Sequence, residues 1–100
     1  MTEYRIATSV LEDIVRGSLA ADDRIRVHAP LPLTRTRPVE ILVDSDKCEV
    51  TVNLDARLGE ALPALASDVR SAIAGALGRM TGLAVGSVDV IFASVFPAGT

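Results

Sequence analysis

The residue types that could carry chemistry are few in this chain, and none occurs in a catalytic pattern. His28 is the only histidine and Cys48 the only cysteine, and they lie far apart in the sequence. A cysteine nucleophile needs a base within hydrogen-bond reach, and a zinc site needs several Cys or His ligands at short spacings. His28 sits on the polar side of a predicted strand, so we expect a surface side chain. Cys48 falls in register with Val50 and Val52, which predicts a small buried hydrophobe.

Neighbouring carboxylates are the other candidates for chemistry. They occur at predicted helix ends and turns, where capping and turn geometry explain them: Glu12 and Asp13, Asp22 and Asp23, Asp44 and Asp46. The glycines are scattered and none opens a helix, so no phosphate-binding loop is predicted. We therefore expect no catalytic residue, no metal and no cofactor, and an enzyme is the least supported class of function.

Length and composition indicate one domain spanning residues 1–100. Nearly half of the residues are hydrophobic but only three are aromatic, which predicts an aliphatic core. The net charge of −3 argues against a general nucleic-acid binder, and a single cysteine rules out an intrachain disulfide. The first residues are polar and charged, and no apolar run reaches the roughly 18 residues that a membrane span needs. We expect a cytoplasmic protein without direct membrane insertion.

The first half of the chain predicts a helix, a strand and a hairpin. Helical spacing of apolar residues predicts a helix over 10–20, with Ser9 and Glu12 as a capping box. Alternation predicts a short strand over 24–28, followed by a proline-rich basic loop over 28–38. Two alternating runs over 39–54, separated by the polar turn at 44–47, predict a hairpin.

The second half predicts a long helix that turns sharply into a strand. The helix starts near Pro63, a residue tolerated in a first turn, and carries an apolar stripe: Leu62, Leu65, Ala66, Val69, Ile73, Ala76, Leu77 and Met80. Gly82 suits the left-handed position after a helix, with Leu83 folding back onto Leu77. From Val85 the spacing changes to that of a strand. Because this strand is apolar on both sides, we expect it to be central or covered at an interface.

This order of elements predicts an α+β fold. Two amphipathic helices would pack on one face of a small mixed four-stranded sheet, giving a two-layer sandwich.

Two surface features stand out from this framework. The segment 24–39 is locally basic, with Arg24, Arg26, Arg35 and Arg37 and no acid, so it could contact phosphate groups, anionic lipid or an acidic partner. The alternative is a solvated charged face. The outer face of the second helix carries small uncharged residues: Ala64, Ser67, Ser71, Gly75 and Gly78. Such a face allows close approach of a second subunit or a partner helix, the alternative being an alanine-rich helix surface.

The stretch "MTGLAVGSVDV" resembles the C-terminal signature of the bacterial alkaline shock protein family, the Gls-type envelope stress response proteins. The matching positions are Met80, Thr81, Gly82, Leu83, Val85, Val88, Asp89 and Val90. "LGEALPALASDVRSAI", "VTVNLDARL" and "IATSVLEDIV" are similar to earlier parts of that family, so the resemblance covers almost the whole chain. The chain departs from the usual family residues at Leu58, Arg70, Gly78 and Asp89, as a divergent member would.

This resemblance implies a small non-enzymatic protein of the bacterial cytoplasm, linked to cell-envelope stress and homeostasis. It implies self-association into a homo-oligomer and a protein partner, in some members a small integral membrane protein that holds them at the membrane. The expected function is therefore a scaffold or adaptor without cofactors. The alternative is a small nucleic-acid-binding module using the basic segment 24–37, although the GXXG clamp and stacking aromatics of such modules are missing.

Overall fold

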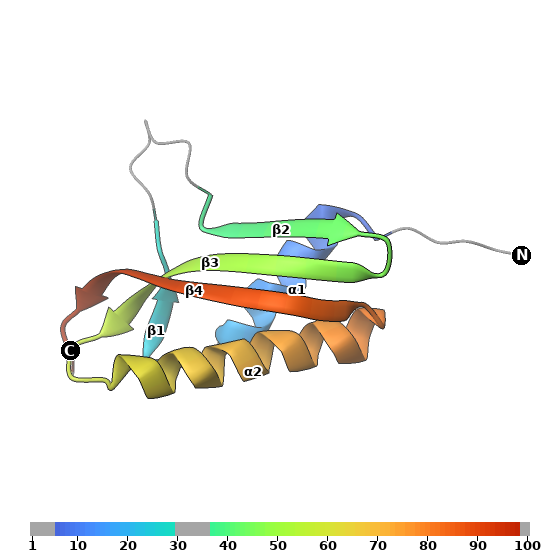
Figure 1. Cartoon of the computed structure of the whole chain (residues 1–100). Coiled ribbons are helices and arrows are strands. Elements are labelled where there is room, and N and C mark those ends of the chain that lie inside the picture. Colours follow the sequence, from blue (N-terminus) through green and yellow to red (C-terminus); the bar gives the residue numbers. More distant parts are fainter. Residues whose placement is uncertain (1–5, 30–36, 99–100) are drawn as a thin grey trace, which may run out of the picture.

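A computed structural model of the chain describes residues 6–29 and 37–98 (Figure 1). The elements follow the order α1 (Thr8–Leu19), β1 (Ile25–Val27), β2 (Val39–Asp44), β3 (Lys47–Arg57), α2 (Leu62–Thr81) and β4 (Ala84–Phe96). The predicted loop over 28–38 lies largely outside the described residues, as does Arg35. The order of elements predicted from the sequence is confirmed.

The sheet is built around β3. On one edge, β2 pairs antiparallel with the first half of β3 and β1 pairs antiparallel with its end. On the other edge, β4 runs parallel to β3 over its whole length. The sheet is therefore mixed and four-stranded, as expected.

The position of β4 corrects part of the prediction, because this strand is not central. Within the described part of the chain, β3 is its only strand neighbour. The hairpin strand β2 and the short β1 occupy one edge of β3, so the crossover through α2 must deliver β4 to the opposite edge. A strand that is apolar on both sides thus lies at the margin of the sheet.

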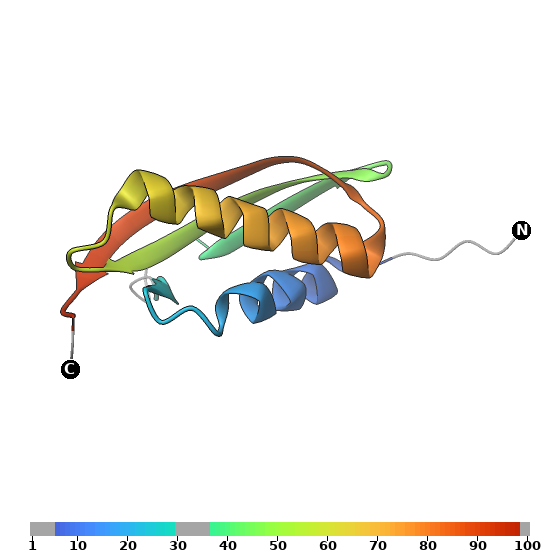
Figure 2. The same cartoon turned by 90° about the horizontal axis from the view of Figure 1, so that it is seen from below.

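Both helices pack on the same face of the sheet (Figure 2). α2 covers the side of β4, and α1 covers the side of β1 and β2. Alternate residues of β3 point at the helices and are buried, while those between them face the open side of the sheet. The core between the layers is aliphatic, as predicted, and includes Leu11, Val15, Leu19, Val50, Val52, Leu54, Leu65, Val69, Ile73 and Leu77.

The predicted capping box of α1 is wrong. The helix begins at Thr8, and Ala7 occupies the cap position without a side-chain hydrogen bond. Ser9 therefore lies inside the first turn instead of ahead of it. Glu12 accepts a hydrogen bond from Arg37 Nη2 at 2.8 Å, so its carboxylate is directed away from the helix start.

The sharp corner after α2 is confirmed. Gly82 has φ of +74°, a left-handed value that costs glycine little, and its N–H donates to the Gly78 carbonyl at 3.0 Å. Leu83 then packs against the core cluster that contains Leu77. The apolar stripe of α2 is shorter than predicted, because Leu62 and Met80 at its two ends are exposed.

Candidate functional site

A polar cluster on the open face of the sheet joins three strands. Arg26 of β1 lies opposite Asp55 of β3, and Asp55 lies opposite Ser94 of β4. His28 follows β1 and donates its backbone N–H to the Asn53 carbonyl at 2.9 Å. This pairing brings His28 Nδ1 to 2.7 Å and Ser94 Oγ to 2.6 Å from the same oxygen, Asp55 Oδ1.

The cluster contains the residue types of a Ser-His-Asp triad but not its order of contacts. In a triad the histidine bonds to the serine and removes its proton, while the aspartate holds the histidine. Here the aspartate lies in the middle, and both the Ser94 hydroxyl and the His28 ring donate to it. Ser94 therefore contacts the carboxylate and not the histidine that activates the serine of a triad. The arrangement links β1, β3 and β4 and does not prepare a nucleophile.

The sequence did not indicate this cluster. It placed His28 on the surface, whereas the ring is half-buried beside Asp55. Asp55 and Ser94 lie 27 and 39 residues away from their partners in the cluster, so no local spacing connects them. Alternation in β3 places Asp55 on the open face, but alternation in β4 predicts Ala93 and not Ser94 beside it. The bulge near Ala93 shifts the register and brings Ser94 opposite Asp55.

The pKa values of two acids and of the buried thiol are shifted by their surroundings. Burial alone would raise the pKa of Asp55, but hydrogen bonds from Ser94 and His28 outweigh it and lower the pKa below its usual value. Hydrogen bonding from Arg24 lowers the pKa of Asp22 in the same way. Burial raises the pKa of the Cys48 thiol, which agrees with the predicted role as a small hydrophobe.

The lowered pKa of Asp55 makes stability depend on pH. The folded pKa lies below the ordinary value of 3.8, so the ionised carboxylate contributes stability above that value and loses it as pH falls through the folded pKa. We expect Asp55→Asn to cost roughly 1–2 kcal/mol at neutral pH and to flatten the loss of stability between neutral and acidic pH. Urea unfolding at a series of pH values measures both effects. Asp44→Asn, at the exposed end of β2, is the matched control. Equal pH slopes in wild type and Asp55→Asn would contradict the assignment.

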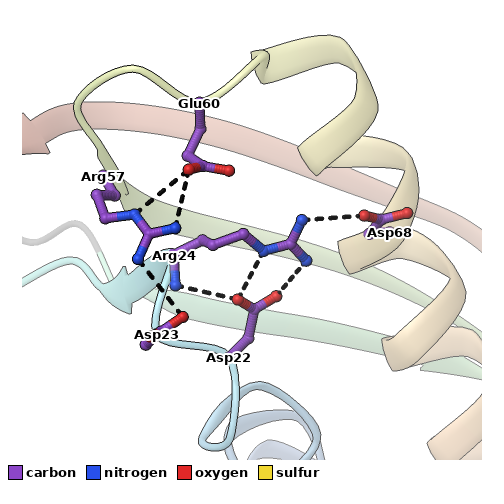
Figure 3. A network of polar contacts seen from close by, with 6 residues as sticks. All are labelled: Asp22, Asp23, Arg24, Arg57, Glu60 and Asp68. Carbon is purple, nitrogen blue, oxygen red and sulfur yellow. Dashed lines mark hydrogen bonds and ion pairs between the residues drawn. The ribbon is translucent and has the colours of Figure 1, made fainter. Parts of the chain in front are cut away.

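An ion-pair network at the same end of β3 engages Arg24 (Figure 3). Its guanidinium bonds to both carboxylate oxygens of Asp22, at 2.9 and 2.7 Å, and contacts Asp68 at the start of α2 at 3.2 Å. Beside it, Arg57 bonds to Glu60 at 3.0 Å and approaches Asp23 at 3.7 Å. Four acids thus surround two arginines. The network ties the turn before β1 to the start of α2.

The predicted basic contact surface is therefore partly neutralised inside the fold. Arg24 is held by Asp22 and Asp68, and Arg37 is held by Glu12. Arg26 lies over the ring of Phe96, 4.0 Å from its centroid, in a cation–π contact on the open face. Asp22 lies only two residues from Arg24. The sequence could not reveal the pairings of Arg24 with Asp68 and of Arg37 with Glu12, because these acids lie 44 and 25 residues away.

The small-residue face of α2 points away from the sheet. Ala64, Ser67, Ser71 and Gly78 are exposed, and Gly75 is half-covered by the side chain of Arg79. A groove of about 580 Å³ runs beside this face between α1 and α2, with Val10 and Met80 exposed at its margins. The predicted residues are thus available at the surface, and their role in association stays a prediction.

The outer edge of β4 has no strand partner among the described residues. Two backbone bonds set the orientation of this strand: Ala84 N–H donates to the Asp46 carbonyl and Leu58 N–H donates to the Phe96 carbonyl, both at 2.8 Å. Combined with the register, they direct the backbone groups of Asp89 and Ile91 toward β3. Those of Val88, Val90 and Phe92 then face outward. Arg70 of α2 confirms this, because its Nε reaches the Val88 carbonyl at 3.1 Å.

Within residues 6–29 and 37–98, no three His, Cys, Asp or Glu side chains come together as a metal site. Neither of the two helices has the length and apolar character needed to cross a membrane. Comparisons with family models, curated proteins and solved structures found no match to this chain.

Proposed function

We propose that this protein is a non-enzymatic scaffold that acts by self-association and by binding a protein partner. One observation carries the proposal: β4 is a long apolar strand whose outer edge is left unpaired by the described fold. Edge strands of this kind are templates for pairing with another chain, and proteins usually protect them. The exposed small-residue face of α2 lies on an adjacent surface and supports the same function.

The polar groups of the molecule favour a scaffold over the two other classes. An enzyme would need an activated nucleophile or a general base facing a substrate cavity, and the His28–Asp55–Ser94 cluster has the wrong order of contacts for this. A nucleic-acid module would need an uncommitted basic surface, whereas Arg24 and Arg37 are engaged by acids of the same chain. The overall charge of −3 also argues against a nucleic-acid module.

The resemblance of the corner at residues 80–90 to the alkaline shock family supports the cellular setting. On this basis we place the scaffold in the bacterial cytoplasm, in the response to cell-envelope stress. Its partner would be a regulatory protein or a small integral membrane protein that brings the scaffold to the membrane. The exposed apolar groove between the two helices offers a second surface for such a partner.

Affinity capture from the protein's own cells tests this proposal. We expect a tagged copy to recover untagged copies of itself and a protein partner, and Gly78→Glu to reduce that recovery at least several-fold by placing a charge on the small-residue face. An added Cβ at Gly78 meets no atom within 4 Å, so this variant should fold. Ala61→Glu is the matched control, since Ala61 is also small and exposed but precedes α2, outside both the small-residue face and the residues that line the groove.

The result that would overturn the proposal is recovery of RNA, or of no macromolecule at all, with the wild-type protein. RNA recovery that falls steeply as salt rises would favour the nucleic-acid module.

A further inference from the structure

We propose that the outer edge of β4 pairs antiparallel with β4 of a second copy, centred on Val90, so that two four-stranded sheets become one. This inference rests on the proposed self-association and names the surface and register through which it occurs. The pairing has a two-fold axis perpendicular to the sheet. Two-fold symmetric dimers are the commonest soluble homo-oligomers.

The direction of the backbone groups makes this edge complementary to itself. Val88, Val90 and Phe92 present their N–H and C=O groups outward, because the intervening residues use theirs toward β3. In an antiparallel pair centred on Val90, Val90 lies opposite its own copy and Val88 lies opposite Phe92. All three positions are then hydrogen-bonded pairs, giving roughly six backbone hydrogen bonds across the seam.

The charge of Asp89 favours the register centred on Val90 over the register centred on Asp89. Asp89 is the only charged residue of β4, and its side chain is exposed on the open face. Centred on Val90, the strands place each Asp89 opposite an Ile91 of the other copy. Centred on Asp89, they would place two carboxylates directly opposite each other, which is destabilising. The pairing we propose keeps both carboxylates next to an apolar side chain that is 48% exposed in the single chain.

The middle of this strand lacks several of the features that keep natural edges unpaired. Edge strands are commonly protected by lysine or proline, or by being short. β4 spans 13 residues and contains neither lysine nor proline. Bulges near Gly86 and Ala93 interrupt the ladder with β3 and leave the stretch between them, which holds the proposed seam, regular.

The same geometry explains why the small residues of α2 are close to this edge. Arg70 reaches Val88 at the edge, and residues three and four positions away share its side of the helix, namely Ser67 and Ala74. A two-fold axis perpendicular to the sheet keeps both α2 helices on one face, one on each side of the seam. Their facing sides then carry the small residues Ser67, Ala74 and Gly78, with Arg70 as the bulky side chain among them. In the dimer, the Phe92 N–H of the other copy takes the Val88 carbonyl that Arg70 holds in the single chain.

Charge substitutions at residue 91 test the register without disturbing the core. Each substituted side chain would face Asp89 of the other copy, so the symmetric dimer contains this contact twice. We expect Ile91→Asp to raise the dimer dissociation constant at least tenfold, and Ile91→Lys to leave it unchanged or lower it. Analytical ultracentrifugation of the full chain measures these constants. The double variant Asp89→Lys with Ile91→Asp should restore association, because opposite charges again face each other.

A proline at residue 90 tests the backbone pairing independently. The Val90 N–H faces outward, so Val90→Pro removes a donor of the seam and none of the bonds to β3. We expect a monomer with an unchanged circular dichroism spectrum. If this variant unfolds, the variants Ile91→Asp and Ile91→Lys still show whether the β4 edges pair.

The failures of the two proposals are distinguishable. A dimer that is weakened equally by Ile91→Asp and Ile91→Lys, or by neither, would overturn the β4 seam while leaving the scaffold function in place. A wild-type protein that stays monomeric but captures an extended segment of another protein on β4 would overturn the second copy as the occupant. A wild type that neither associates nor captures a protein would overturn both.

Discussion

Replacing Leu54 with alanine is expected to lower the free energy of unfolding by about 3–4 kcal/mol, within the range for fully buried leucines. Leu54 lies in β3, the strand that all others contact, and its side chain is completely buried against the helices. Truncation removes apolar contacts and leaves a cavity between two layers that are fixed by the sheet. Equilibrium unfolding in urea, monitored by circular dichroism, measures the change.

Leu42→Ala is the matched control for this prediction. Leu42 belongs to β2 but is 72% exposed on the open face, so the same substitution should change stability by no more than about 0.5 kcal/mol. Similar losses for the two variants would contradict a sheet that is covered on one face only.

Thr81→Val is expected to destabilise the protein by about 2 kcal/mol, although it changes neither shape nor volume greatly. The Thr81 hydroxyl is buried at the corner between α2 and β4, donates to the Leu77 carbonyl at 2.6 Å and accepts the Leu83 N–H at 3.1 Å. Valine removes both bonds and leaves the Leu83 N–H without this acceptor. The free energy of unfolding measures the loss.

Thr81→Ser separates the two contributions of this side chain. Serine keeps the hydroxyl and removes only a methyl group, so it should retain most of the stability. If serine destabilised the protein as much as valine, packing of the methyl group and not hydrogen bonding would hold the corner.

The corner and the edge are connected parts of the fold. Gly82 and Thr81 end α2 and direct the chain into β4, and the Ala84 N–H then bonds to the Asp46 carbonyl beside the β2–β3 turn. This bond starts the parallel ladder and fixes which backbone groups of β4 face β3. The local chemistry of the corner thus determines which groups remain on the outer edge for a second chain.

The sequence by itself determined the elements of this protein and the composition of its core. Helical spacing, strand alternation, the Asp44–Lys47 turn and the glycine at position 82 are local signals, and each acts through neighbouring residues. They led to the correct order of two helices and four strands, and to an aliphatic core with Cys48 inside it. The capping box failed because several residues at that helix start could serve as its first turn.

The tertiary structure alone decided which elements and side chains are neighbours. Alternation shows which side chains of a strand share a face but not which strand lies beside it, so β4 was expected in the centre or at an interface and is found at the edge. Asp68 beside Arg24, Glu12 beside Arg37 and Ser94 beside Asp55 come from distant segments. Only the strand pairing and helix packing bring them within hydrogen-bond distance. The polar cluster, the neutralised arginines and the open edge of β4 therefore have no signature in any single stretch of the sequence.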